Sequence, residues 1–196
     1  MSLRIALVTD EPGWHGARLC EAFAARDCEV QLVSLCDCAI DLVSAPQGLL
    51  LPGFEEQLPD GVFVRGVPGG TLEQVVLYLD VLHMLESAGI PVYNNGRAIE
   101  RSVDKGMTSM LLQRAGIAVP PTWVVSSEER GQDIWARERA AGHRLVVKPL
   151  FGSQGKGLAR LSLQDPLPPL ADYQGVYYLQ RFVEGQHFDW RIFVIN

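Results

Sequence analysis

Residues 146–161 read VVKPLFGSQGKGLARL, and this stretch gives the strongest fold signal in the chain. Two valines and a lysine predict a strand, a glycine cluster follows, and an alternating apolar pattern resumes after Gly157. We therefore expect two strands joined by a glycine-rich turn. Backbone N–H groups in such a turn can lie over phosphate oxygens, while Lys148 reaches the same anion from the leading strand. An ordinary glycine-rich hairpin with a surface lysine is equally compatible with this stretch alone.

Two common phosphate-binding motifs do not fit these residues. A Walker loop needs Gly, four residues, and then Gly-Lys-Ser/Thr. When Gly155 and Lys156 supply the Gly-Lys pair, the first glycine falls on Leu150 and the hydroxyl position on Gly157. A dinucleotide fingerprint, G-x-G-x-x-G, fails because Arg160 occupies its last glycine position. The stretch is therefore neither motif.

Composition narrows the class of protein. The chain has 196 residues, 47% of them hydrophobic, which is enough for one sizeable core or two small ones. The net charge of −6 argues against binding nucleic acid by phosphate neutralisation. The sequence shows neither a membrane-spanning apolar run nor a signal-peptide pattern, so we expect a cytoplasmic location. The four cysteines are interpreted as reduced thiols, because Cys36-Asp37-Cys38 is too tight for ordinary zinc ligation.

Strands alternate with helices in the first half of the chain. Thr71 is the expected N-cap of a long amphipathic helix that Gly89 ends. The expected strands are LRIALVTD (3–10), CEVQLVSL (28–35), GVFVRGV (61–67) and IPVYNN (90–95), and the expected helices are GARLCEAFAARD (16–27) and LEQVVLYLDVLHMLESAG (72–89). This α/β order predicts a doubly wound parallel sheet over residues 1–95.

The second half has a different character, with repeated strands after few helices. Its expected helices are DKGMTSMLLQRAG (104–116) and SEERGQDIWARERAAG (127–142). Its further expected strands are VPPTWVVSS (119–127), GVYYLQRFVEG (175–185) and HFDWRIFVIN (187–196). This order predicts an α+β lobe whose antiparallel sheet includes Lys148.

Several of these segments together resemble the ATP-grasp superfamily, and more narrowly its RimK-type glutamate ligases. The resemblance covers residues 94–125, 145–161, 179–185 and 189–194 in the family's order, and VRGVPGG (64–70) resembles its arginine-containing loop. It implies a pre-ATP-grasp domain over 1–95, an ATP-grasp small lobe with a nucleotide lid over 96–183, and the first strand of an incomplete C-terminal lobe over 184–196.

The resemblance also implies roles for individual residues. The implied nucleotide-binding residues are the phosphate-holding Lys105 and Lys148, the lid residues Gly152, Ser153, Gln154, Gly155 and Gly157, the adenine hinge Gln180, Arg181, Phe182 and Val183, and the ribose-contacting Asp189. The implied substrate-binding residues are Arg65 and Arg191. An acidic residue is usual in the family where Arg181 stands, and because the hinge acts mainly through its backbone, we expect adenine binding to persist despite this departure.

Plain structural roles compete with several of these assignments. Lys105 could be a solvated residue near a helix start, and Arg65 could cap the loop that follows it. Asp189 and Arg191 could form a same-face pair, because residues i and i+2 of a strand project together.

The implied activity is ATP-dependent carboxylate–amine ligation through an acyl phosphate, adding L-glutamate to a peptide or a small cofactor. The implied cofactors are ATP and magnesium, with the metal ligands expected beyond Asn196. No catalytic residue or metal ligand is assigned within the chain, so we expect an active parent enzyme and an inactive, truncated chain.

The expected partners are ATP, a carboxylate acceptor and an amino-acid amine. We expect binding to neither nucleic acid nor a membrane, and the sequence is compatible with a homo-oligomer. Two alternatives stay open. One is a non-catalytic, nucleotide-binding regulatory module. The other is an ATP-grasp ligase of the D-alanine–D-alanine or glutathione-synthetase kind.

Overall fold

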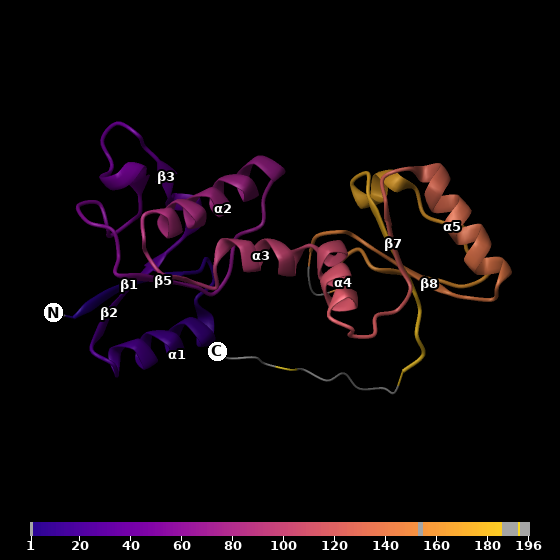
Figure 1. The fold of residues 1–196 in the computed structure, drawn as a ribbon, viewed down its shortest axis with the longest axis horizontal. Helices are drawn as coiled ribbons and strands as arrows, with labels where there is room; N and C mark the ends of the chain where they lie inside the picture. Colours follow the sequence, from indigo (N-terminus) through magenta and orange to yellow (C-terminus); the bar gives the residue numbers. More distant parts are fainter. Residues whose placement is uncertain (1, 153–154, 186–191, 193–196) are drawn as a thin grey trace. The chain divides into compact units, whose positions relative to one another are not determined.

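The computed structural model describes residues 2–152, 155–185 and 192 of the chain (Figure 1). The chain divides into two compact units, Met1–Glu100 and Arg101–Asn196. The division falls within helix α3 (Gly96–Val103), close to the boundary expected after residue 95. The sequence had predicted no helix at α3. Among the described residues, no helix is long and apolar enough to cross a membrane.

The first unit contains a four-stranded parallel sheet, as expected. Its strand order is β2-β1-β5-β6, formed by β1 (Leu3–Val8), β2 (Cys28–Val33), β5 (Gly61–Val64) and β6 (Val92–Tyr93). Helices α1 (Gly13–Ala24) and α2 (Leu72–Ser87) lie on opposite faces of this sheet (Figure 1). A short antiparallel pair, β3 (Ala39–Ile40) and β4 (Leu49–Leu50), was not expected. The prediction of a doubly wound sheet is confirmed.

Helix α2 begins at the predicted N-cap. The backbone N–H of Gln74 donates to Thr71 Oγ1 at 3.4 Å, and the backbone N–H of Thr71 donates to Gln74 Oε1 at 2.9 Å, which completes a capping box. The buried residues of the helix are Tyr78, Val81, Leu82 and Leu85. They pack with the sheet residues into the core of the first unit.

The second unit contains the predicted antiparallel sheet. Its order is β7-β10-β8-β9, formed by β7 (Thr122–Val125), β8 (Leu145–Lys148), β9 (Ala159–Leu161) and β10 (Tyr177–Arg181). Strands β8 and β9 pair with Leu145 opposite Leu161, so the strand, glycine turn and strand expected at residues 146–161 are confirmed. Helix α4 (Lys105–Arg114) has Asp104 as its N-cap, and α5 (Glu128–Ala140) has Ser127.

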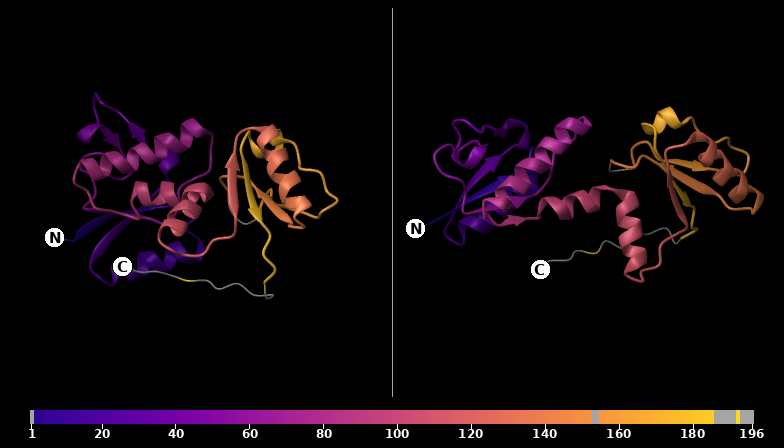
Figure 2. Two further views of the ribbon diagram at one scale, coloured as in Figure 1. Left: turned by 45° about the vertical axis from the view of Figure 1, so that its right-hand side comes forward. Right: turned by 45° about the horizontal axis from the view of Figure 1, so that its top comes forward.

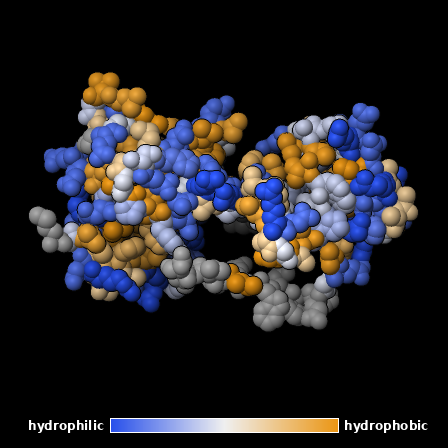
Figure 3. All heavy atoms as spheres, in the orientation of Figure 1, coloured by the Kyte–Doolittle hydropathy of each residue, from blue (hydrophilic) through white to orange (hydrophobic). Residues whose placement is uncertain are grey.

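The two faces of this sheet differ in what covers them. Helix α5 packs against one face, where Ile134 and Trp135 meet Val147, Tyr177 and Leu179 in a buried core (Figure 2). Side chains alternate along a strand, so the neighbours of these sheet residues project from the opposite face. In each unit, polar and apolar side chains are interleaved on the visible surface (Figure 3). The strand predicted over 187–196 lies outside the described residues, apart from Ile192.

Candidate functional site

Lys148, the last residue of β8, projects from the sheet face opposite α5. Its Nζ donates a hydrogen bond to Gln180 Oε1 at 2.9 Å. Gln180 Nε2 in turn donates to Thr122 Oγ1 at 2.9 Å and to the Tyr178 hydroxyl oxygen at 3.0 Å. Residues from three strands therefore hold the Lys148 ammonium in place, and all of these partners are neutral.

Lys105, the first residue of α4, lies beside the start of the glycine turn. Its Nζ donates to the carbonyl oxygens of Leu150 at 3.2 Å and Gly152 at 2.8 Å. Ser109 fixes the first turn of α4 to the sheet: its hydroxyl donates to Lys105 O at 2.8 Å and is 2.8 Å from the Tyr178 hydroxyl oxygen. The two lysines assigned from the sequence are thus brought to the same face of one sheet.

Electrostatics set these two ammonium groups apart from surface lysines. Burial lowers the pKa of Lys148 below its ordinary value. Burial also lowers the pKa of Lys105, the charge of Lys148 lowers it further, and Asp104 acts in the opposite direction. A nearby anion would stabilise both charged lysines at once.

A groove of about 320 Å³ runs along this face beside Lys148. It is lined by Pro120, Val146, Lys148, Leu158, Arg160, Gln180, Arg181, Phe182 and Val183. Among the described residues, this lining includes the cationic side chains of Lys148 and Arg160 and no carboxylate, and most of the remainder is apolar. The groove is suited to a ligand with an apolar planar part and a negative charge.

The backbone at the end of β10 offers a hydrogen-bond acceptor to this groove. The N–H of Arg181 donates to Pro121 O at 2.8 Å, and the N–H of Phe182 donates to Arg144 O at 2.8 Å. Pro121 lies opposite Arg181 but has no N–H, so it cannot return a hydrogen bond to the Arg181 carbonyl. Proline at this point therefore ends the ladder, and β7 supplies no donor to that carbonyl.

The side chain of Arg181 belongs to the other face of the sheet. Its Nε and Nη2 donate to Glu138 Oε2 at 3.0 and 2.7 Å, and the Glu138 residue is only 4% exposed. Burial by itself would raise the pKa of Glu138, but the hydrogen bonds and charge of Arg181, with smaller contributions from Arg137 and His143, together outweigh it and the pKa is lowered. Because of this pairing, the charged group of Arg181 is directed to Glu138 and not into the groove.

Three glycines of the turn have positive φ angles: Gly152 at 108°, Gly155 at 71° and Gly157 at 70°. These are left-handed conformations that residues with a Cβ rarely adopt. At Gly157, a Cβ would also lie 2.8 Å from Pro149 Cγ. Glycine is therefore required here by the turn itself. Ser153 and Gln154, which complete the predicted lid, lie outside the described residues.

The remaining assigned residues are Arg65, Asp189 and Arg191. Arg65 belongs to the first unit, where it follows β5, is exposed, and donates its backbone N–H to Val8 O at 2.9 Å. It lies at the carboxyl end of the parallel strands, where such sheets bind ligands, and its substrate role stays a prediction. Asp189 and Arg191 lie outside the described residues.

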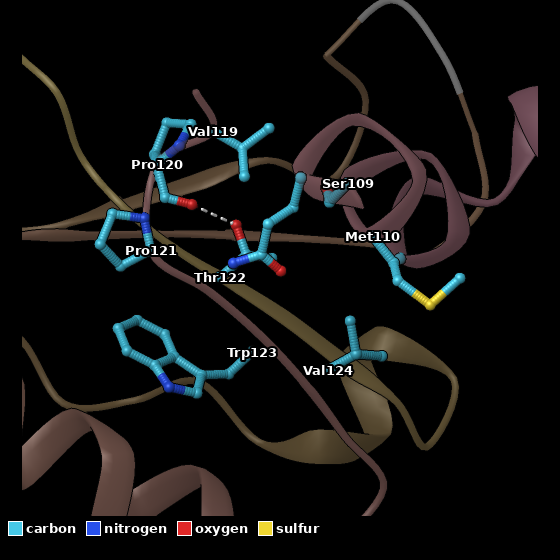
Figure 4. A pocket seen from close by; sticks show the side chains of 10 residues that line it. Ser109, Met110, Val119, Pro120, Pro121, Thr122, Trp123 and Val124 are labelled. Atoms are coloured by element: carbon cyan, nitrogen blue, oxygen red, sulfur yellow. Dashed lines mark hydrogen bonds between the residues drawn. The ribbon is translucent and has the colours of Figure 1, made fainter. Parts of the chain in front are cut away.

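Sequence reasoning missed the neutral residues that position the lysines. Ser109 and Thr122 line a second pocket, of about 430 Å³, between α4 and β7 (Figure 4). Thr122 Oγ1 donates to Pro120 O there at 2.7 Å, the contact drawn as a dashed line. Period-two alternation along β10 could have grouped Tyr178 with Gln180, but no local signal identifies Ser109.

Comparison with known proteins gives three informative similarities, although no family model matches the chain. The chain is 34% identical over 153 residues to the tetrahydromethanopterin:alpha-L-glutamate ligase of Methanosarcina acetivorans, covering 70% of the chain and 46% of that protein. It is similar to the RimK domain protein ATP-grasp from Sphaerobacter thermophilus, with 26% identity, a TM-score of 0.63, and coverage of 93% and 65%.

The third similarity is to the ATP-grasp ligase PsnB, in a structure that holds a minimal precursor, Mg and ADP. The identity is 22% and the TM-score is 0.60, with coverage of 92% of this chain and 66% of that one. The chain spans about half the length of the curated relatives that it matches.

Proposed function

We propose that this chain, which belongs to the ATP-grasp superfamily and is similar to its RimK-type glutamate ligases, is the nucleotide-binding part of an ATP-dependent carboxylate–amine ligase. In the full protein, the γ-phosphoryl group of ATP passes to a carboxylate, giving an acyl phosphate and ADP. The amine of an amino acid, L-glutamate in our proposal, then displaces phosphate and forms an amide. A peptide or a small cofactor supplies the carboxylate.

The observation that supports nucleotide binding is the pair of partly buried ammonium groups beside a groove without carboxylates. We place the phosphates of ATP at Lys148 and Lys105, where they compete with the carbonyls that now accept from Lys105. We place the adenine in the groove, its amino group donating to the Arg181 carbonyl and a ring nitrogen accepting from the N–H of Val183. The amides of the glycine turn complete the phosphate contacts.

The described residues do not fit a magnesium ion. Mg²⁺ prefers oxygen ligands, often carboxylates. The groove lining contains none, and the described part of the chain has no group of three or more His, Cys, Asp or Glu that could hold a metal. We therefore propose no role in metal binding for these residues, and we propose that the magnesium ligands lie beyond Asn196.

Arg65 and Arg191 are proposed to bind the acceptor in the full-length enzyme. For Arg65, the support is its exposed position after a parallel strand. Arg65→Ala is expected to lower kcat/KM for the acceptor while leaving ATP binding unchanged. Arg26→Ala, an exposed substitution in the same unit, is the matched control. An unchanged kcat/KM for Arg65→Ala would exclude the role.

Nucleotide binding can be tested directly on the 196-residue chain by calorimetry with ATP. Wild-type chain is expected to bind, and Lys105→Met and Lys148→Met are expected to bind more weakly. Absence of binding by the wild type would contradict the proposal. In the full-length protein, ADP release that depends on acceptor and amine tests the ligase. Binding without any ADP release there would point to a regulatory module instead.

A further inference from the structure

Arg160 lies in the groove, but neither the sequence motifs nor the proposed phosphate contacts give it a role. It is the middle residue of β9 and pairs directly with Val146 of β8. Directly paired residues share a face of the sheet, so Arg160 projects to the same face as Val146 and Lys148. Its guanidinium carbon is 3.7 Å from the centre of the Phe182 ring, and both side chains line the groove.

Among the described residues, Arg160 differs from the other arginines around it in having no acidic partner. Arg144 also lies over the Phe182 ring, at 5.0 Å, but it forms an ion pair with Glu184. Arg181 is paired with Glu138. Within residues 2–152, 155–185 and 192, no carboxylate forms an ion pair with Arg160. Within the described part of the chain, the ring of Phe182 is therefore the contact that orients this guanidinium.

A guanidinium is planar and stacks on aromatic groups. When one side lies against Phe182, the other side remains a flat surface, and nucleobases stack on such arginine planes as they do on aromatic rings. The adjacent Val146 and Leu158 extend the same lining with apolar groups. We propose that Arg160, oriented by Phe182, is the platform on which the purine base of the nucleotide stacks. This inference rests on the proposed function.

The test separates the base from the phosphates by using adenosine and inorganic tripolyphosphate as separate probes. Both are titrated into the 196-residue chain and followed by NMR shifts of the groove amides. Arg160→Leu removes the plane and the charge, whereas Arg160→Lys keeps the charge without the plane. Both variants are expected to bind adenosine about fivefold more weakly, or worse, as loss of a stacking surface requires. Tripolyphosphate affinity should stay within about twofold, because the role assigned is contact with the base.

Two further variants sharpen the result. Arg139→Leu is the matched control, because Arg139 also lies over an aromatic ring, that of Trp135 at 5.8 Å, but on α5 at the opposite face. It is expected to leave both affinities unchanged. Phe182→Leu removes the support while keeping Arg160, and should weaken adenosine binding. Combined with Arg160→Leu, it should add little more, since both changes remove one unit.

Three outcomes would overturn the proposal. Adenosine affinity could be unchanged in Arg160→Leu, or fully retained in Arg160→Lys. Alternatively, tripolyphosphate affinity could fall as much as adenosine affinity in Arg160→Leu, which would make the residue a phosphate contact. Failure of the wild-type chain to bind adenosine, tripolyphosphate or ATP would reject the proposed function as well. Binding by the wild type that is independent of Arg160 would reject only this inference.

Discussion

Along β10, the adjacent residues Gln180 and Arg181 face opposite sides of the sheet, and their surroundings differ in charge. On the α5 side, Arg181 is paired with the buried Glu138. On the groove side, Gln180 gives Lys148 a neutral acceptor. Both sides therefore hold a partly buried cation, but among the described residues only the α5 side supplies a counter-charge.

This difference distinguishes a charged group that stabilises the fold, Arg181, from a charged group that can bind a ligand, Lys148. A buried ion pair that loses one member leaves an uncompensated charge, so the Glu138–Arg181 pair is tied to folding. Lys148 has a lowered pKa because burial penalises its charged form, and no carboxylate among the described residues offsets that cost. The charged Lys148 on the groove face therefore lowers the stability of the fold, which is typical of binding sites.

The largest expected effect is on the α5 side. Glu138→Ala leaves the Arg181 guanidinium without its partner and should lower the free energy of unfolding of the second unit by about 3 kcal/mol. Chemical denaturation followed by fluorescence measures this, because Trp135 is buried in that unit's core. Glu129→Ala, an exposed change near the start of α5, is the control and should have little effect. Equal stability of the two variants would show that the ion pair does not support the fold.

The second prediction concerns the groove side and has the opposite pattern. Lys148→Met should weaken ATP binding tenfold or more, because a charge-assisted contact with phosphate is lost. Its free energy of unfolding should stay within about 1 kcal/mol of wild type, since the burial cost of the ammonium disappears together with its hydrogen bond. Calorimetry and denaturation of the same sample give both numbers, and Arg130→Met on α5 is the control. A large loss of stability in Lys148→Met would contradict the proposed difference between the two faces of the sheet.

The third prediction concerns the pH dependence of stability. The contribution of Glu138 on the α5 face should change at acidic pH, and that of Lys148 on the groove face at alkaline pH. The folded pKa of Glu138 lies below its ordinary 4.5, so its stabilisation is present above pH 4.5 and is lost as pH falls through the folded value. The folded pKa of Lys148 lies below 10.5, so its burial cost is relieved as pH rises from the folded value toward 10.5, while ATP affinity falls.

Differences between variants and wild type isolate these two groups from all other titrating residues. Glu138→Gln should lose part of the acid dependence of unfolding, and Lys148→Met part of the alkaline dependence. The effect of Glu138→Gln is expected to be smaller than that of Glu138→Ala, because glutamine keeps the volume and an acceptor oxygen. Identical pH profiles for wild type and Glu138→Gln would mean that Glu138 titrates normally.

Local signals made much of this arrangement predictable from the sequence. The strand pattern around Lys148 and the glycines after it depend on short-range rules, namely period-two alternation and positive φ angles. The cap at Thr71 is equally local. Helix α3 was not predicted, although its sequence GRAIERSV contains no helix breaker after its first residue.

The contacts that distinguish the two faces join residues far apart in the chain, and no window of sequence contains them. Glu138 and Arg181 are 43 residues apart, and Ser109 and Tyr178 are 69 apart. Likewise, Arg160 meets Phe182 only because β9 and β10 both flank β8. These partners can be predicted only when it is known that α4 and α5 pack on opposite faces of the sheet.

The smallest expected effect is that of magnesium on ATP binding by this chain. The groove lining contains lysine, arginine and neutral side chains but no carboxylate, so the described residues offer no ligand set that would hold the metal against ATP. Magnesium should therefore change the affinity by less than about threefold, through the reduced charge of the nucleotide alone. Calorimetry with magnesium and with a chelator tests this, and the same samples should release no ADP. Tight binding that requires magnesium would mean that the groove face carries a metal site. The two faces would then differ in the ligand that they bind, and the groove face would no longer be distinguished by lacking a counter-charge.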